Sequence, residues 1–234
     1  MQPVKFYFDF INQSSRALYI LMEASKIPFE AIPISTLKGE HLTGEFRDKV
    51  SPFKCLPVIN DDNLSLSESV AIFRHLNREK IVPEHWYPRR NYGRSRVDEF
   101  LEWQQRNVSN ACGNYFQQKW LLPLLDKTPP EDKNINAATH RLNQVLKDFE
   151  SLFLNKTKFV IGDTISYADL IAICEIDQPK FIGFDPFNHH PKLGKWYDEV
   201  REALGPYYKK VAEEFDNKVK RAEKKIPEVM YLQQ

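Results

Sequence analysis

The sequence predicts an α/β N-terminal domain followed by an all-α C-terminal domain. Strand-like and helix-like patterns alternate between residues 4 and 78, and beyond residue 88 only the helical spacing of apolar residues recurs. The stretch between them, residues 80–88, holds two prolines and shows no periodicity, which is typical of a linker. We therefore divide the chain into an N-terminal domain at 1–79, a linker at 80–88 and a helical domain at 89–234.

The N-terminal domain is expected to follow the order β-α-β-α-β-β-α. The turn-rich cluster Asn60-Asp61-Asp62-Asn63 predicts that the last two strands form a hairpin. A strand, a helix and a strand in succession imply a parallel pair with a right-handed crossover. Strands are expected at 4–10, 29–34, 57–59 and 64–66, and helices at 14–25, within 37–50 and at 68–78.

The helical domain is expected to begin with a long helix. Apolar residues between 97 and 116 lie on one helical face, and we expect this helix to end before Pro123. A proline-rich loop at 128–130 then precedes a second helix, whose apolar positions run from 135 to 153.

Two further signals lie toward the C-terminus. Ser166 and Asp169 have the spacing of a capping box, which predicts a helix start with a structural role for both side chains. The segment after Pro206 is rich in lysine, which fits either a solvated helical face or a flap over an active site.

Composition excludes several classes of protein. The 234 residues carry a net charge of +1, so no electrostatic footprint favours nucleic acid or an anionic membrane. No run of 18 apolar residues suggests a spanning helix, and the N-terminus shows no signal-peptide pattern. Cys55, Cys112 and Cys174 are spaced too widely for a disulfide framework or a zinc site, which favours a reducing, cytoplasmic setting. The adjacent pair His189-His190 has no further ligand at helical spacing, so we expect no metal site.

The stretch around Leu56-Pro57, with Glu68-Ser69 further along the chain, predicts a binding site. Pro57 suits the first residue of a strand because proline cannot donate to a sheet. A cis bond before it would expose the N–H and C=O of Leu56, which can pair with an extended peptide as a β-strand does. Glu68 and Ser69, at the start of a helix, can hold charged groups of that peptide. Together they predict a site for a small, zwitterionic, extended peptide.

These residues resemble those of the glutathione transferase family. Leu56-Pro57 with Glu68-Ser69 is typical of the superfamily, and Trp86-Tyr87-Pro88 with the run from 94 to 104 is similar to the theta class, in its insect-like form. The resemblance runs from about residue 4 to about residue 210. It implies a thioredoxin-like N-terminal domain that binds glutathione as co-substrate, a helical domain that forms an electrophile pocket, a homodimer and no metal.

The resemblance also implies a role for individual residues. Glu68 and Ser69 correspond to the pair that holds the γ-glutamyl end, and Ser69 is expected to cap its helix as well. Leu56 corresponds to the residue whose backbone pairs with the cysteinyl part, and His41 and Lys54 to the groups that face the glycine carboxylate. Cys55 replaces a lysine and contributes its backbone, either as an inert buried thiol or, alternatively, as a reactive one. The implied glutathione-binding set is His41, Lys54, Cys55, Leu56, Pro57, Glu68 and Ser69.

The catalytic position departs from the family pattern. Theta enzymes carry a catalytic serine in a Ser-Gln-Pro-x-Arg motif, and here the run is Asn12-Gln13-Ser14-Ser15-Arg16. Asn12 can donate an amide N–H to sulfur, or it can act only as a helix N-cap, or it can do both. Ser14 or Ser15 is the alternative source of a hydroxyl, and Arg16 is expected to be structural.

Two functions follow from this resemblance. The first is conjugation of the glutathione thiolate to small hydrophobic electrophiles, with glutathione peroxidase activity besides, since some relatives with asparagine at this position favour peroxide or disulfide chemistry. The second is a catalytically weak carrier that binds glutathione or hydrophobic compounds. A thiol-disulfide reductase is a third, weaker hypothesis, because no Cys-x-x-Cys motif is present. Tyr115, Phe116 and Trp120 are candidates for the electrophile pocket or, alternatively, for the helical core.

Overall fold

The N-terminal part of the chain forms a four-stranded sheet with the strand order β2-β1-β3-β4. The computed structural model describes residues 3–89, 92–154 and 156–224. Strand β1 pairs in parallel with β2 and antiparallel with β3, and β3 and β4 form the predicted hairpin. The strands span Val4–Phe8 (β1), Phe29–Pro33 (β2), Val58–Asp61 (β3) and Leu64–Ser67 (β4). The α/β character and the parallel first unit are therefore confirmed.

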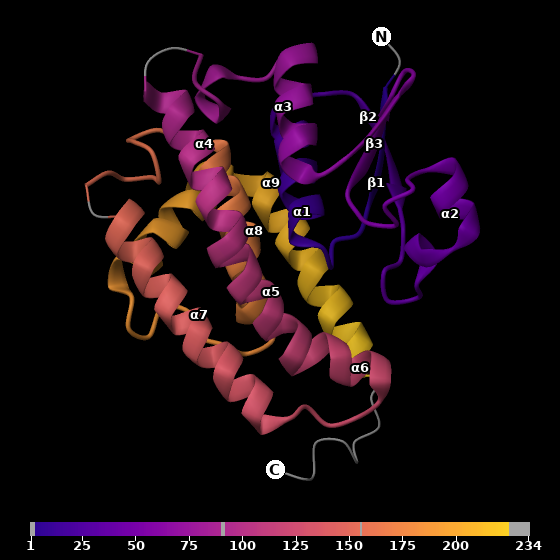
Figure 1. The fold of residues 1–234 in the computed structure, drawn as a ribbon. Coiled ribbons are helices and arrows are strands. Elements are labelled where there is room, and N and C mark those ends of the chain that lie inside the picture. The colour runs from indigo at the N-terminus through magenta and orange to yellow at the C-terminus, as the bar shows by residue number, and fades with distance from the viewer. Residues whose placement is uncertain (1–2, 90–91, 155, 225–234) are drawn as a thin grey trace.

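Two helices cover the face of the sheet that looks toward the helical domain. These are α1 (Gln13–Ala24) and α3 (Ser69–Glu79), while the short α2 (Gly44–Lys49) lies on the opposite side of the sheet (Figure 1). A 3₁₀ turn, η1 (Glu40–Leu42), precedes α2, and another, η2 (Glu84–Trp86), lies within the predicted linker. Helix α1 buries its whole middle, because it packs on the sheet on one side and on the helical domain on the other.

The first helix of the helical domain extends further than predicted. It continues without a break from α4 (Tyr92–Gln104) to α6 (Leu122–Asp126), so the expected end before Pro123 is wrong. Pro123 lies in the first turn of α6, where its missing N–H costs little because a π-helical segment precedes it. The intervening segments are the π-helical η3 (Gln105–Ser109), α5 (Asn110–Phe116) and the π-helical η4 (Gln117–Leu121).

Helix α8 (Tyr167–Lys180) lies at the centre of the helical domain. It is buried on nearly every side, between α1, α4, α5 and the last helix α9 (Pro191–Glu223) (Figure 1). The predicted second helix is α7 (Asp132–Phe153). Helix α9 bends at Gly205, whose φ of +53° suits glycine. Its second half buries one apolar face, and its lysines are exposed except Lys218, which is half-buried. The solvated-face interpretation of this segment is confirmed as far as Lys224, and residues 225–234 lie outside the described chain.

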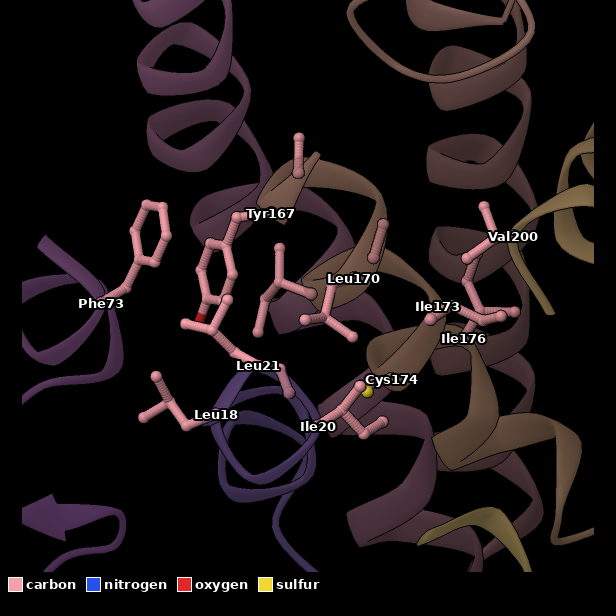
Figure 2. Packing of buried hydrophobic residues seen from close by; sticks show 14 of the residues in the cluster. Leu18, Ile20, Leu21, Phe73, Tyr167, Leu170, Ile173, Cys174, Ile176 and Val200 are labelled. Atoms are coloured by element: carbon pink, nitrogen blue, oxygen red, sulfur yellow. The ribbon is translucent and has the colours of Figure 1, made fainter. Parts of the chain in front are cut away.

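The two domains share one hydrophobic core. Phe73 of α3 stacks on Tyr167 of α8 with ring centroids 3.8 Å apart, and Leu18 and Leu21 of α1 lie beside them (Figure 2). Such stacked rings add to the area that they bury, so this contact helps to fix the sheet relative to the helices. The orientation of α1 toward the helical domain is therefore set by packing rather than by a flexible linker.

Candidate active site

The predicted site residues come together at one edge of the sheet. The pairs Tyr7–Val58 and Val58–Ser67 align β1, β3 and β4, so the residues just beyond them, Pro57 and Glu68, are neighbours. The bond between Leu56 and Pro57 is cis, as predicted. Strand β1 pairs with β3 and ends at Phe8, at this same edge, and the turn around Asn12 follows before α1 begins at Gln13.

Asn12 is the N-cap of α1. Its Oδ1 accepts a hydrogen bond from the N–H of Ser15 at 2.8 Å, and its own N–H donates to the carbonyl of Asp9 at 2.9 Å. The capping interpretation is therefore confirmed. The cap uses only the amide oxygen, and no hydrogen bond within the described residues involves Nδ2, so that donor is available to a ligand.

The two serines that follow differ in access. Ser15 is fully buried and its hydroxyl has no partner among the described residues, so a bound substrate would not reach it. Ser14 is half-buried in the first turn of α1. Of the two alternative hydroxyl donors, therefore, only Ser14 is accessible to a bound substrate.

Glu68 has an unusual backbone. Its φ of +70° with ψ of +112° lies outside the regions that residues with a Cβ favour, at a cost of roughly 1–3 kcal/mol. The exposed Glu68 occupies the N-cap position of α3 but makes no capping bond, and Ser69 is the first helical residue. The expectation that Ser69 caps this helix is therefore wrong, because the helix already begins at Ser69 and the N-cap position falls on Glu68. Both side chains remain available to a ligand.

Three further predicted residues are Cys55 and Lys54, which precede Leu56 in its loop, and His41, which is close enough to Asp9 to interact with its charge. Cys55 is half-buried, and burial together with the charge of Glu68 raises the pKa of its thiol, which favours the inert alternative. Lys54 has a φ of +52° and is half-buried in the same loop. Burial lowers the pKa of His41, and its Nδ1 is buried without a partner in the described part of the chain. His41 thus offers a neutral ring nitrogen for a hydrogen bond.

Arg16 holds the loop before α1, as its expected structural role requires. Its Nη1 donates to the carbonyls of Phe10 and Ile11 at 2.6 and 3.3 Å, and its Nη2 donates to the carbonyl of Cys174 at 2.6 Å. Gln178 of α8 also donates to the carbonyl of Ile11, at 3.0 Å. These bonds attach the loop that carries Asn12 to the centre of the helical domain. Gln178 was missed by the sequence analysis, because no pattern links it to a loop 167 positions away.

Glu175 is a buried acid behind the start of α1. Burial raises the pKa of Glu175 to about 7, although hydrogen bonds from Ser109 and Gln13 and the charge of Arg16 act to lower it. Its Oε2 has no hydrogen-bond partner among the described residues. This carboxyl therefore changes charge near neutral pH within the core that supports α1.

We expect Glu175 to make stability depend on pH. An unfolded glutamate has a pKa of 4.5, so between that value and about 7 the folded protein keeps a proton that the unfolded chain has lost. The stabilisation is complete below about pH 4.5 and is lost as the pH rises toward 7. Relative to Glu175→Gln, the free energy of unfolding of the unmodified protein should fall by up to about 3 kcal/mol between about pH 4 and 8. Urea denaturation at each pH measures this difference, with the exposed Glu79→Gln as control, and parallel curves for Glu175→Gln would contradict it.

The three aromatic candidates for an electrophile pocket pack into the helical core. Tyr115 contacts Phe184 with centroids 5.1 Å apart, and Phe116 contacts Trp120 at 4.8 Å. All three are less than 10% exposed. The core alternative is therefore confirmed for Tyr115, Phe116 and Trp120.

The described part of the chain offers neither a cluster of metal ligands nor a spanning helix. Within the described residues, no three histidine, cysteine or acidic side chains converge as metal ligands would. Over the same part of the chain, no helix combines the length and the apolar character that crossing a bilayer requires.

Comparison with known proteins gives the family. Residues 3–78 match the family described as "Glutathione S-transferase, N-terminal domain", and residues 114–211 match "Glutathione S-transferase, C-terminal domain". Glutathione S-transferase theta-1 of Mus musculus is 36% identical over 219 residues, which cover 93% of this chain and 90% of the relative. The Homo sapiens theta-1 protein is 36% identical over 202 residues, covering 86% and 84%.

Solved structures agree with the sequence comparison. The apo form of human glutathione S-transferase T1-1 has a TM-score of 0.88 at 35% identity, covering 93% of this chain and 91% of the other. A human theta-class enzyme in complex with the glutathione conjugate of 1-menaphthyl sulfate has a TM-score of 0.90 at 29% identity, covering 99% and 98%. The chain therefore belongs to the glutathione S-transferase family, whose members are transferase enzymes. Within that family its relatives place it in the theta class.

Proposed function

We propose that this chain conjugates the thiolate of glutathione to small hydrophobic electrophiles and also reduces hydroperoxides with glutathione. The observation that carries the proposal is the convergence of the Asn12 turn, the loop at Leu56-Pro57 and the Glu68-Ser69 pair at one edge of the sheet. In this proposal residues 1–79 bind glutathione, 80–88 link the domains and 89–234 bind the electrophile. Related human theta enzymes have been solved with glutathione and with a glutathione conjugate, which supports the substrate class.

Glutathione would lie extended along the backbone of Leu56. Glu68 and Ser69, which make no capping bonds of their own, would hold the γ-glutamyl end through its charged groups. His41 and Lys54 would face the glycine carboxylate. Cys55 and Pro57 would contribute shape and backbone only, since the raised pKa of Cys55 keeps its thiol neutral.

Asn12 would stabilise the thiolate. A thiol has a pKa of roughly 8.5 in water, and lowering it to about 6.5 requires about 2.7 kcal/mol of preferential stabilisation of the anion. The N-terminus of α1 supplies free N–H groups and a favourable dipole, and Asn12 Nδ2 adds one donor while Oδ1 keeps the cap. Ser14, in the same turn, is a second donor to be tested.

The electrophile would bind at the half-buried rim of an apolar cluster next to this turn. Phe215 and Val219 of α9 pack there with Ile11, the residue before Asn12, and the half-buried Leu37 adjoins them. A hydrophobic surface beside a thiolate favours small apolar electrophiles, because both partners are then held close together. The buried members of this cluster, which support the binding surface from within, are Ile11, Phe116, Trp120, Phe215, Val219 and Ala222.

We also propose that the chain forms a homodimer. Phe53, in the loop before β3, is 69% exposed, and Tyr92, at the start of α4, is 86% exposed. Large apolar side chains as exposed as these two are found at protein interfaces. A cytoplasmic location, the insect-like branch of the theta class, and the lack of nucleic-acid and membrane partners stay predictions from the sequence.

The alternative function is a weakly catalytic carrier of glutathione or hydrophobic compounds. Asn12 favours it, because the amide caps α1 with its oxygen, and the directions of its two Nδ2 N–H groups are then fixed by the amide plane. A serine hydroxyl can rotate toward sulfur, whereas this amide plane is already fixed by the N–H of Ser15.

Substitutions of Asn12 separate these alternatives. Asn12→Asp keeps a strong cap but removes the N–H donor, so we expect the pKa of bound glutathione to rise to about 8.5 or above, with a fall in conjugation rate of about tenfold or more. Asn12→Ser keeps both the cap and a donor and should conjugate at least as fast as the unmodified protein. The ultraviolet thiolate band titrated from about pH 5 to 9, with chlorodinitrobenzene and cumene hydroperoxide assays, measures these effects. An unperturbed thiol pKa and neither activity in the unmodified protein would leave only the carrier.

A further inference from the structure

Asp9 is a buried carboxylate at the end of β1, three residues before Asn12. It is 1% exposed, and its two oxygens accept hydrogen bonds from four groups. Oδ2 accepts from the N–H and the hydroxyl of Thr36 at 2.8 and 2.7 Å, and Oδ1 accepts from the N–H of Ile11 at 3.2 Å. The fourth donor is Nζ of Lys218, 2.7 Å from Oδ1. Although burial acts to raise it, these donors hold the pKa of Asp9 below its usual value.

Asp9 determines where Asn12 lies. Its backbone carbonyl accepts the N–H of Asn12, and its carboxylate accepts the N–H of Ile11. Two successive backbone N–H groups of the turn are therefore bonded to the same residue. The Thr36 bonds attach the same carboxylate to the segment after β2, five positions before His41. A displacement of Asp9 would therefore move the Asn12 amide relative to the rest of the site.

Lys218 makes this arrangement depend on the last helix. It lies in the second half of α9, one turn from Phe215, whose ring lies 3.8 Å from the Arg16 guanidinium carbon. Its side chain is 35% exposed, whereas the carboxylate that it meets is excluded from water. Without the ammonium group, Asp9 would keep its neutral donors but lose its counter-charge. A buried charge left without its partner is strongly unfavourable, so the surrounding turn would rearrange or take up water.

We infer that Asp9 and Lys218 are a positioning pair for glutathione chemistry, in which α9 fixes the direction of the Asn12 amide toward the sulfur. This inference rests on the proposed function, since it concerns the same bound thiolate. Neither residue needs to touch the substrate. Their effect on the thiolate would pass through the turn from Asp9 to Asn12, which both the sheet and the last helix hold.

The test compares two lysines of α9. Lys210 also joins α9 to α1, through Glu23 at 3.3 Å and the hydroxyl of Tyr19 at 3.1 Å, but at the far end of α1. In the full chain we expect Lys218→Met to raise the pKa of bound glutathione by about one unit and to lower kcat about tenfold, with KM for glutathione changed by less than about twofold. Lys210→Met is expected to leave the thiol pKa unchanged. The thiolate band and steady-state kinetics measure these quantities.

If Lys218 had a purely structural role, these measurements would give a different result. If Lys218→Met and Lys210→Met lower the thermal midpoint equally and neither changes the thiol pKa, the inference is overturned. The double variant Asp9→Asn/Lys218→Met should be no slower than the worse single variant, because both act through one bond, whereas additive losses would contradict the pairing. If the unmodified protein neither lowers the thiol pKa nor conjugates, the proposed function itself fails, and that outcome is distinct from a lowered pKa that is insensitive to Lys218.

Discussion

Replacing Asp169 by alanine is expected to lower the free energy of unfolding by about 4 kcal/mol. This carboxylate is fully buried and accepts from the N–H of Val160 at 2.8 Å, from Trp196 Nε1 at 2.9 Å, and from both the N–H and the hydroxyl of Ser166 at 2.9 Å each. Alanine would leave these four donors unpaired in the core, and each unpaired buried group costs about 1–3 kcal/mol. The thermal midpoint should fall by roughly 10 °C for a chain of this size.

The control is Asp163→Ala, in the loop that precedes α8. Asp163 is exposed, and among the described residues it accepts only a 3.5 Å contact from the N–H of Lys158, so its loss should change stability by less than about 0.5 kcal/mol. Differential scanning calorimetry on the three proteins makes the comparison. Equal midpoints for Asp169→Ala and the unmodified protein would show that the capping box does not hold the start of α8.

Many helices and strands were predictable because short sequence patterns indicate where they begin and which face they bury. The capping box of Ser166 and Asp169 is confirmed, since both partners lie within one helical turn. Pro123 shows the limit of this reasoning. Its effect on a helix depends on whether the preceding turns are α or π, and the spacing of apolar residues does not reveal a π segment.

The site was predictable only where it follows from short motifs. Leu56-Pro57 and Glu68-Ser69 are brought together by a β-hairpin whose turn residues are visible in the sequence. Asp9 and Lys218, by contrast, are 209 positions apart, and each alone is an ordinary acid or an ordinary surface lysine. A periodic pattern shows which face of α9 is buried but not which loop lies against it, so this ion pair required the structure.

Replacing Glu68 by alanine is expected to abolish retention of the protein on immobilised glutathione. Glu68 is exposed, makes no capping bond and sits at a strained φ of +70°, so its side chain does little for the fold. If it holds the charged γ-glutamyl end, removing it leaves that charge unpaired, and KM for glutathione should rise about 100-fold. Steady-state kinetics with varied glutathione, together with the column, measures the loss.

Two variants show whether the side chain or the backbone is responsible. Glu68→Gly should bind as poorly as Glu68→Ala but be more stable by about 1 kcal/mol, because glycine tolerates the positive φ without strain. Glu79→Ala, at the exposed end of the same helix, should behave like the unmodified protein. If Glu68→Ala is retained on glutathione as well as Glu79→Ala, the peptide does not bind at this edge, and the strained backbone at Glu68 serves the fold alone.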